Sequence, residues 1–559
     1  MTNTSTNSDS DSNLRIIPLG GLGEIGRNMM LIEYGDDIIV IDVGLMFPEE
    51  EMLGVDLVIP DFTYLRENQQ KLRAVFLTHG HEDHVGALPY FMREFHAPIY
   101  STRLTDGLIR VKLNEHRLLQ TAETHVVKPG ESIQAGVFEV EFFTVAHSIP
   151  DACGLIIRTP LGPLVHTGDF KLDHTPVMDQ HTDLIRLAQV GAEGCLVLMA
   201  DSTYAEMEGY TPSEQLVGDA LRTIIVNAKG RVIVATFASL ISRVQLVLDG
   251  AVATGRKVFV TGRSMIDNVA MARQLGYLNA PDGVLVGVEE MRNTPAAKLV
   301  IVTTGSQGEP TSALTRMANG DHRHITIVEG DTVVLSSSPV PGNEQAVYRN
   351  VDNLFRLGAE VLYNRIANIH VRGHASREEL KIIQGLVQPE YFVPIHGEYR
   401  HLVVHAKLAE SVGVPAGQAF VMTDGDVLEI DDETAWLADR VPASYVYIDG
   451  LGIGDVDQHI LRDRAHLSTD GVVVVIVTVD KQTGRLERPA EVLARGFVDA
   501  DEGGELLERS KEIVSRSLAG SVHYAEFSDV NTRIRDAVSK FLYDETRRRP
   551  MVLTVTVEV

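Results

Sequence analysis

The sequence predicts an α/β protein, because short apolar runs alternate with amphipathic stretches along most of its 559 residues. A second observation supports this class: small or polar residues come directly after many of the apolar runs. Examples are Asp42-Val-Gly44, His79, Gly168-Asp169, Asp201 and His396-Gly-Glu398. Functional sites of open α/β sheets gather at the carboxyl ends of strands. We therefore expect one site built from segments that lie far apart in the chain.

Composition and charge limit the possible partners and compartments. The chain has 77 acidic and 50 basic residues and a net charge of −27, which disfavours nucleic acid unless a basic channel lies on an acidic body. No apolar run is long enough to span a membrane. The two cysteines, Cys153 and Cys195, predict a reducing cytoplasmic location rather than a disulfide framework. Residues 1–13 are polar, lack the features of a secretory signal, and predict a disordered tail.

The densest cluster of ligand-type side chains is His79-Gly-His81-Glu-Asp83-His84, which follows the apolar run 74–78. His79 and His81 point the same way from an extended segment, and the turn after them can face a second ion. Imidazole and carboxylate ligands suit Zn²⁺ or Mn²⁺ better than Ca²⁺. A solvated His-rich turn or a structural zinc is the alternative, although structural zinc usually binds cysteine.

Three further residues could complete the coordination of two ions. His147, Asp169 and His396 each follow an apolar run. Taken singly, each could equally be a polar group satisfied at a strand end. Together with the cluster at 79–84 they supply the number of ligands that two ions need.

This set of residues resembles the metal-binding motifs of the metallo-β-lactamase fold of hydrolases, which implies an αββα sandwich. The resemblance implies that His79, His81 and His147 hold one metal, that Asp83, His84 and His396 hold the other, and that Asp169 bridges them. Asp42 matches an aspartate that orients the ligand loop without binding metal.

The middle of the chain resembles the β-CASP branch of that fold, whose members cut nucleic acids. Asp201-Ser-Thr203 matches the first signature of this branch. Thr304–Pro310 is a Gly-rich loop whose backbone N–H groups could cradle an anion, or it is an ordinary turn between a strand and a helix. His370-Val-Arg-Gly-His374 resembles the phosphate-contacting loop, and His374 matches the catalytic histidine there; a buried or capping histidine is the alternative.

The full run of motifs resembles the ribonuclease J family over residues 14–559, with Leu19–Gly26, Ala235–Ser239, His396–Arg400 and Arg495–Val498 among them. The resemblance implies 5′→3′ exonuclease and endonuclease action on RNA, in RNA maturation and decay. It also implies a preference for single-stranded RNA with a 5′-monophosphate end. We expect a tail (1–13), a metallo-β-lactamase domain in two parts (14–208 and 369–455), an inserted α/β β-CASP domain (209–368), a linker (456–466) and a small α/β C-terminal domain (467–559).

The resemblance also implies partners. Self-association through the C-terminal domain, as a homodimer or homotetramer, is expected, and other RNA-decay proteins are possible partners. No membrane association is expected. Two divalent ions per subunit, Zn²⁺ or Mn²⁺ or both, are the expected cofactors, and the ligand types do not choose between them.

The substrate loops depart from the family pattern, although the metal ligands are intact. Leu240 stands where Asn is usual, Ser242 where His is common, and Arg372 where Ser is usual. Arg372 could bind the substrate phosphate through a charge-assisted contact, or it could point into solvent or pair with a carboxylate. The residues expected to bind substrate are Ser239, Leu240, Ile241, His370, Val371, Arg372, Gly373 and His374.

The expected mechanism is in-line attack of a hydroxide on the scissile phosphorus beside two metal ions. Asp201 would position or deprotonate the water and His374 would protonate the leaving 3′-oxygen, giving 5′-phosphate and 3′-hydroxyl products. The residues expected to be catalytic are Asp201 and His374, together with the metal ligand Asp83. Four arginines, Arg243, Arg263, Arg316 and Arg372, are expected to line an RNA channel, although each could instead form a surface ion pair.

Three alternatives share part of this evidence. A β-CASP nuclease acting on DNA would carry the same motifs, since none of them reads a 2′-hydroxyl. A metallo-hydrolase of small molecules, such as a lactonase or thioester hydrolase, would need the metal ligands but not the insert. A non-catalytic scaffold or RNA-binding subunit would have no chemical need for so many metal ligands.

Overall fold

The computed structural model describes residues 13–49, 51–178, 180–340, 343–480, 486–499, 503–519 and 527–559. The predicted tail, 1–13, lies outside this part of the chain except for Asn13. The chain divides into two compact units. One comprises the residues up to Phe47 together with Leu57–Val446, and the other comprises Pro48–Asp56 and Tyr447–Val559.

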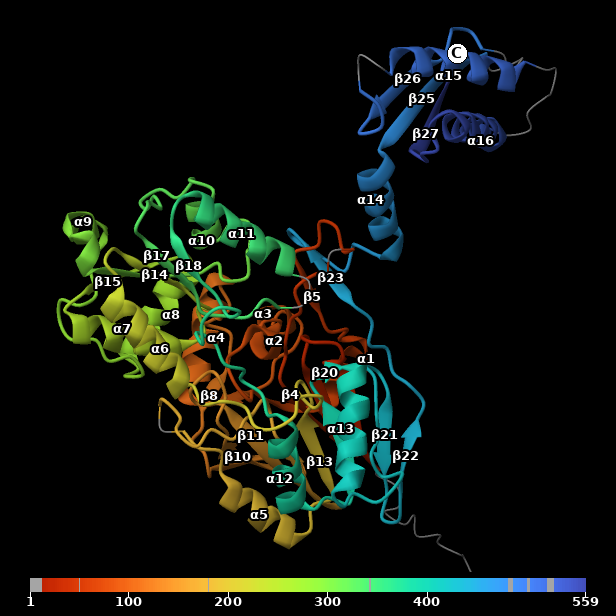
Figure 1. The fold of residues 1–559 in the computed structure, drawn as a ribbon. Coiled ribbons are helices and arrows are strands. Elements are labelled where there is room, and N and C mark those ends of the chain that lie inside the picture. The colour runs from red at the N-terminus through yellow and green to blue at the C-terminus, as the bar shows by residue number, and fades with distance from the viewer. Residues whose placement is uncertain are drawn as a thin grey trace, which may run out of the picture. The chain divides into compact units, whose positions relative to one another are not determined.

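Two sheets form the body of the first unit (Figure 1). The first sheet contains β1 (Leu14–Gly20), β3 (Met29–Tyr34), β4 (Asp37–Ile41), β6 (Leu72–Phe76), β7 (Ile99–Ser101), β8 (Thr124–Val126), β21 (Val427–Ile430) and β22 (Ala435–Ala438), in the order β22-β21-β1-β3-β4-β6-β7-β8. The second contains β9 (Ser132–Ala135), β10 (Phe138–Thr144), β11 (Cys153–Thr159), β12 (Gly162–His166), β13 (Val197–Asp201) and β19 (Tyr391–Ile395), in the order β19-β13-β12-β11-β10-β9.

The two sheets share one apolar core. Ile32 and Phe76 from the first sheet belong to the same buried cluster as Phe142, Leu164 and Val393 from the second. Helices α5 (Leu184–Glu193), α12 (Arg377–Val387) and α13 (Tyr399–Ser411) cover the other face of the second sheet, where their apolar residues join a separate cluster. The αββα sandwich implied by the resemblance is therefore confirmed.

Short elements complete the sandwich. They are β2 (Leu22–Gly23), β5 (Leu57–Ile59), β20 (Gly397–Glu398), α1 (Thr63–Glu67), α2 (Glu82–Val85), α3 (Leu88–Phe91) and α4 (Arg103–Glu115). β2 pairs with β20, which ties the loop after β1 to the segment that follows β19.

An insert with its own parallel sheet separates β13 from β19, although these two strands are direct neighbours. Its strands are β14 (Val232–Ala235), β15 (Lys257–Thr261), β16 (Leu299–Thr303), β17 (Thr332–Leu335) and β18 (Glu360–Leu362), in the order β15-β16-β14-β17-β18. Its helices are α6 (Gln215–Asn227), α7 (Ile241–Thr254), α8 (Arg263–Gln274), α9 (Val288–Asn293), α10 (Ala313–Ala318) and α11 (Glu344–Arg356).

The insert is apolar on both faces of its sheet, as a parallel sheet covered by helices must be. Side chains alternate between the faces. Val232 and Val234 join the cluster that contains α6, α7 and α8, whereas Ile233 and Ala235 join the cluster that contains α10 and α11.

The second unit is a small α/β domain preceded by a helix. Strands β23 (Val446–Asp449) and β24 (Gly452–Ile453) form a hairpin, and α14 (Gln458–Asp470) follows. The segment 456–466, expected as a linker, is therefore largely helical. The Asp457 side chain caps α14 by accepting hydrogen bonds from two backbone N–H groups.

The C-terminal sheet has the order β26-β25-β27 and is covered on one face. Its strands are β25 (Val472–Val479), β26 (Glu491–Arg495) and β27 (Met551–Glu558), and its helices are α15 (Gly504–Leu518) and α16 (Phe527–Thr546). Val473, Val475 and Val477 pack against both helices. The opposite face of the sheet carries Leu493, Leu553, Val555 and Val557, which are 44–52% exposed. In the described part of the chain, no helix combines the length and apolar character needed to cross a membrane.

Candidate metal centre

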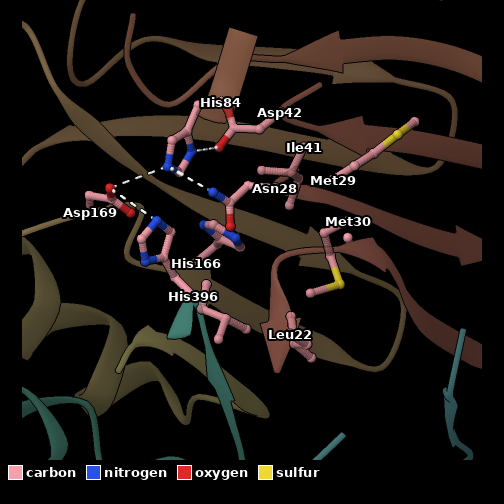
Figure 2. Close-up of a pocket in the computed structure, with 12 residues that line it drawn as sticks. Leu22, Asn28, Met29, Met30, Ile41, Asp42, His84, His166, Asp169 and His396 are labelled. Atoms are coloured by element: carbon pink, nitrogen blue, oxygen red, sulfur yellow. Dashed lines mark hydrogen bonds and ion pairs between the residues drawn. The ribbon is translucent and has the colours of Figure 1, made fainter. Parts of the chain in front are cut away.

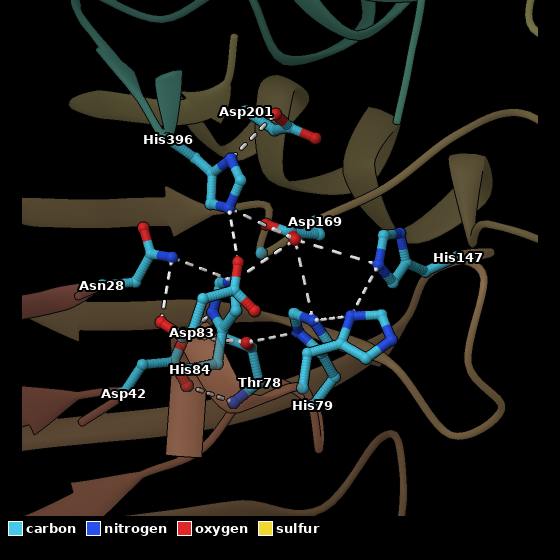
Figure 3. A network of polar contacts seen from close by, with 12 residues as sticks. Asn28, Asp42, Thr78, His79, Asp83, His84, His147, Asp169, Asp201 and His396 are labelled. Atoms are coloured by element: carbon cyan, nitrogen blue, oxygen red, sulfur yellow. Dashed lines mark hydrogen bonds and ion pairs between the residues drawn. The ribbon is translucent and has the colours of Figure 1, made fainter. Parts of the chain in front are cut away.

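The ligand-type side chains converge at one edge of the sandwich, where β4, β6, β10, β12, β13 and β19 end (Figure 3). The structure brings together all seven residues expected to hold metal. They form two groups, His79, His81, His147 and Asp169, and Asp83, His84, Asp169 and His396, with the ligand atoms of each group within 4.8 Å of one another. Asp169 belongs to both groups.

In the first group, three imidazole nitrogens face one another at short distances. His79 Nδ1 donates to the Thr78 hydroxyl at 3.0 Å, because that hydroxyl itself donates to Asp42. His147 Nδ1 donates to the Gly373 carbonyl at 2.8 Å. The Nε2 lone pairs of both rings therefore point at His81 Nδ1, at 3.0 and 3.2 Å. A cation fits this arrangement, since it would accept the Nε2 lone pairs of His79 and His147 together with the Nδ1 lone pair of His81 when the His81 proton lies on Nε2.

Burial reinforces this demand for a cation. It lowers the pKa of His79 and His147 well below the ordinary value and lowers the pKa of His81 to about 4. The three rings are thus neutral at pH 7, which is the state in which an imidazole binds a metal.

The second group combines two imidazoles with carboxylates. His84 Nδ1 donates to Asp42 at 2.7 Å and His396 Nδ1 donates to the Thr203 hydroxyl at 2.7 Å. Their Nε2 atoms lie 3.2 and 3.5 Å from Asp169. Burial alone would lower the pKa of His84 and His396, but Asp169 and its neighbouring carboxylates outweigh burial and raise both values, that of His396 to about 9.

The carboxylates of this group stay ionised despite their burial. Burial acts to raise the pKa of Asp83 and Asp169, but the neighbouring histidines lower both well below the ordinary value. The negative charge of these carboxylates draws protons onto His84 and His396, and a divalent cation would meet the same need for positive charge.

Asp42 and Thr78 hold the ligand loop from behind. Asp42 has a positive φ of 59°, a conformation that non-glycine residues rarely adopt. Its carboxylate accepts from the Thr78 backbone N–H at 2.7 Å and from the Thr78 hydroxyl at 2.8 Å as well as from His84. One carboxylate thus orients a ligand of each group, in line with the orienting role expected for Asp42.

A small pocket of mixed polar and apolar lining contains His84, Asp169 and His396 of the second group (Figure 2). Leu22, Met30 and Ile41 line it together with His84 and Asp169. Asn28 also lines it and donates to the Asp83 backbone carbonyl at 3.0 Å. Apolar walls strengthen electrostatic interactions at the centre because they lower the local dielectric constant.

Asp201 and His374 form a pair next to the two groups. His374 Nδ1 donates to Asp201 Oδ2 at 2.7 Å, and the other oxygen of Asp201 accepts from the Thr203 backbone N–H and hydroxyl. Burial acts against both charges, but the pair still lowers the pKa of Asp201 and raises that of His374. Both oxygens of Asp201 are engaged, and the pair fixes the His374 ring with Nε2 free to carry a proton.

The predicted substrate segment 239–242 is placed differently from expectation. The side chains of Leu240 and Ile241 are buried, and Ile241 lies in the apolar core. Only Ser239 of the three predicted residues is partly exposed. Because apolar packing occupies the side chains of Leu240 and Ile241, any substrate contact there would use the backbone at the start of α7. Ser242 donates to the Ser148 carbonyl, in the loop of His147, at 3.0 Å.

The expectation that Arg243 lines an RNA channel is wrong. Arg243 is 1% exposed, and one of its guanidinium nitrogens, Nη2, donates to both carboxylate oxygens of Glu214 at 2.8 and 3.0 Å. It also donates to the Ser336 and Ile369 carbonyls, so it joins α7 to two other segments of the chain. Arg263 and Arg316 are exposed.

The segment 370–374 contributes through several different atoms. The Gly373 carbonyl orients His147, and Val371 is buried. Burial lowers the pKa of His370 to about 3, helped by Arg243, and its Nδ1 has no hydrogen-bond partner among the described residues. Arg372 is partly exposed and lies over the ring of Tyr204, with Cζ 4.8 Å from the ring centroid.

Sequence reasoning missed several residues of this site. Thr78 and Asn28 hold the ligand loop by hydrogen bonds, and Tyr204 lies beside His374, with ring centroids 5.8 Å apart. Thr78 and Tyr204 are direct neighbours of the named motifs, which is the signal that could have indicated them. Asn28 lies far from the motifs in sequence and carries no such signal.

The fold and this centre define a class of hydrolase, and comparisons with protein families agree. Residues 22–197 match the metallo-beta-lactamase superfamily and residues 229–354 match the beta-CASP domain of ribonuclease J. Residues 359–417 match the Zn-dependent metallo-hydrolase RNA specificity domain, and residues 459–559 match the ribonuclease J C-terminal domain.

Curated relatives are similar over nearly the whole chain. The chain is 42% identical to Ribonuclease J2 of Bacillus subtilis over 550 residues, covering 98% of this chain and 99% of that protein. It is 45% identical to Ribonuclease J of Thermus thermophilus over 556 residues, covering 98% and 95% of the two chains. The chain belongs to the ribonuclease J family. It is a metal-dependent ribonuclease, with a domain for RNA specificity and a requirement for divalent metal.

One solved structure shows the same fold at low sequence identity. It is a protein of unknown function from Enterococcus faecalis, with a TM-score of 0.53 and 16% identity, covering 75% of this chain and 100% of that one.

Proposed function

We propose that this ribonuclease is a 5′→3′ exonuclease that prefers 5′-monophosphate RNA, has additional endonuclease activity, and acts in RNA maturation and decay with two divalent ions. The observation that carries the proposal is the pair of ligand groups that share Asp169, with Asp201 and His374 beside them. This combination offers places for two cations and a proton donor at one centre.

In the proposed reaction, the side chains of this protein would bind two metal ions, orient one another and transfer a proton. His79, His81 and His147 would hold one ion, Asp83, His84 and His396 the other, and Asp169 both. Two bound divalent ions, Zn²⁺ or Mn²⁺, would polarise the phosphoryl oxygens and lower the pKa of a nearby water.

The proton of the leaving group is assigned to His374. Its Nδ1 donates to Asp201, so Nε2–H can protonate the 3′-oxygen as the phosphodiester bond breaks, which leaves 5′-phosphate and 3′-hydroxyl products. Because both oxygens of Asp201 are already engaged, we assign it to orienting His374 rather than to deprotonating the water.

We further propose that the protein self-associates through the C-terminal domain, as a homodimer or homotetramer. The support is the uncovered sheet face that carries Leu493, Leu553, Val555 and Val557, since contiguous exposed apolar residues are typical of association surfaces. Leu553→Lys with Val555→Lys should shift the mass measured by light scattering to that of a monomer. Val226→Lys, at a 57% exposed residue of α6, is the control that should leave the mass unchanged. An unchanged mass in the double variant would contradict the proposal.

A cytoplasmic location and RNA-decay protein partners complete the proposal. Both cysteines are free and buried, which suits a reducing compartment.

The test of the function uses one RNA with a 5′-monophosphate, a 5′-triphosphate or a 5′-hydroxyl end, incubated with Zn²⁺ or Mn²⁺. Mononucleotides released fastest from the monophosphate end, and absent with Asp169→Ala and His374→Ala, are the expected result. Internal cuts that do not depend on the 5′ end would overturn the exonuclease assignment. DNA and ester substrates in the same assay test the two hydrolytic alternatives, a DNA nuclease and a small-molecule hydrolase.

A further inference from the structure

Arg372 is held differently from Arg243, its neighbour in the substrate loops. Arg243 is buried and neutralised by Glu214. Arg372 is partly exposed, and among the described residues its guanidinium has neither an ion pair nor a hydrogen bond. Its contact is with the face of Tyr204, 4.8 Å from the ring centroid. All five N–H donors of this guanidinium are therefore unused by the described protein, in a chain whose net charge is −27.

Tyr204 fixes where this stacked pair lies. It follows Asp201-Ser-Thr203 directly, and its ring meets that of His374 at 61° with centroids 5.8 Å apart. A backbone bridge to Ser376 ties Tyr204 to the loop that carries His374. Burial raises the pKa of the Tyr204 hydroxyl, so the ring is neutral at neutral pH and suited to contact a cation. The pair of Tyr204 and Arg372 thus lies beside the proton donor.

We propose that Tyr204 and Arg372 form a stacking subsite for the nucleobase on the leaving-group side of the scissile bond. The inference rests on the proposed function, in which His374 gives its proton to the 3′-oxygen. That oxygen belongs to the nucleotide 5′ of the bond, so the sugar and base of this nucleotide must lie near His374. RNA-binding proteins stack unpaired bases on aromatic rings and on guanidinium planes.

The geometry favours a base over a bare phosphate as the ligand of this pair. The contact with the Tyr204 ring restrains the planar guanidinium of Arg372, and a flat ligand can stack on a restrained plane at little entropic cost. The N–H edge of Arg372 could instead bind the terminal phosphate, and that contact would make the effect of Arg372 depend on the 5′ end rather than on the base.

The experiment removes the base and the side chain separately. Two RNAs differ only in having a normal or an abasic nucleotide 5′ of the bond that is cut. Wild type should lose about tenfold in kcat/KM on the abasic RNA, within the range for stacking one base. Arg372→Ser and Tyr204→Leu should each lose about tenfold on the normal RNA and little more on the abasic one.

Two further variants keep the test decisive. Arg372→Lys retains the charge without the plane, and it should behave as Arg372→Ser does. Arg349→Ser removes an exposed arginine of α11 and should remain as sensitive to the abasic nucleotide as wild type. Thermal unfolding of each variant identifies any that is misfolded. The sensitivity to the abasic nucleotide is then compared with wild type for those of Arg372→Ser, Arg372→Lys and Tyr204→Leu that fold.

The inference is overturned if Arg372→Ser and Tyr204→Leu stay as sensitive to the missing base as wild type. It is also overturned if Arg372→Lys restores full activity, or if the defect of Arg372→Ser appears only on RNA with a 5′-monophosphate. Failure of the proposed function would look different, because wild type itself would then release no mononucleotides from the normal RNA. In that case the affinities of wild type and of the Arg372 and Tyr204 variants for the normal and the abasic RNA are compared instead of kcat/KM.

Discussion

The two sides of the catalytic centre differ in how their side chains are held. On the metal side, the Nδ1 atoms of four of the five ligand histidines donate to nearby acceptors, as His84 does to Asp42 and His147 to Gly373; His81 is the exception. On the substrate side, Arg243 is locked inside the insert by Glu214, whereas Arg372 has only the face of Tyr204. Two arginines of the predicted substrate segments therefore lie in different environments. The difference comes from contact partners that are distant in sequence, Glu214 for Arg243 and Tyr204 for Arg372.

The largest effect is expected on the metal side, at Asp169. Asp169→Asn keeps the size but removes the charge that both ligand groups share, so kcat should fall by at least about 10³-fold. Bound metal per chain, measured by mass spectrometry, should fall in the same variant. Asp219→Asn, at an exposed residue of α6, is the control that should change neither. Full metal content with normal kcat in Asp169→Asn would contradict the proposal that both ions depend on the carboxylate charge of Asp169.

A smaller loss is expected when the proton donor is removed. His374→Gln should lower kcat by about 10²- to 10³-fold, because general acid catalysis typically contributes that much. Unlike Asp169→Asn, it should leave the metal content unchanged. Asp201→Asn should cause a similar loss, and the double variant should be little worse than either, since the two residues act as one unit. Additive losses would show that Asp201 has a role of its own, such as acting on the water.

Thr78→Val tests how the metal side is oriented. The substitution keeps the shape but removes the oxygen that accepts from His79 and the proton given to Asp42. Metal affinity should fall by about 10- to 100-fold, with kcat at saturating metal nearly unchanged. Activity titrated against Mn²⁺ measures both quantities. An unchanged affinity would mean that the hydroxyl does not orient the ligand.

The contrast between the two sides explains what the sequence alone could predict. Four of the seven metal-ligand candidates come from one short motif, 79–84, whose local pattern indicates metal binding. The other three follow apolar runs and were candidates only together with that motif, and the structure brings all seven together. The α/β class was predictable from the alternation of apolar runs and amphipathic stretches, which is a local feature, whereas the αββα sandwich and the inserted domain were expected from the family resemblance.

Partners that depend on the fold could not be predicted in this way. Glu214 lies 29 residues before Arg243, and no local pattern pairs them. Leu240 and Ile241 stand in a motif associated with substrate, but the start of α7 turns their side chains into the interior. For Arg372 the sequence left three positions open, and the structure shows a contact that was not among them, with the ring of Tyr204, 168 positions earlier in the chain.

Breaking the buried pair on the substrate side should affect stability more than catalysis. Glu214→Leu leaves the Arg243 charge buried without a partner, so the free energy of unfolding should fall by about 3–5 kcal/mol. Urea unfolding measures this loss, and kcat/KM at low temperature should change by less than about threefold because neither side chain touches the metal centre. Arg243→Met in the same chain should restore part of the stability. A large loss of activity in a folded Glu214→Leu variant would show that the pair also serves the reaction.

The smallest effect is expected where the two sides meet, at Ser242. Its hydroxyl donates to the Ser148 carbonyl, next to His147, and Ser242→Ala removes that single bond. A lost neutral hydrogen bond typically changes a free energy by about 1 kcal/mol, so kcat/KM should fall by less than about fivefold. Metal affinity should stay unchanged, because the Gly373 carbonyl still orients the His147 ring. If Ser242→Ala weakened metal binding as much as Thr78→Val, the insert would also orient the metal ligand His147 through Ser148. The metal side and the substrate side would then not be independent.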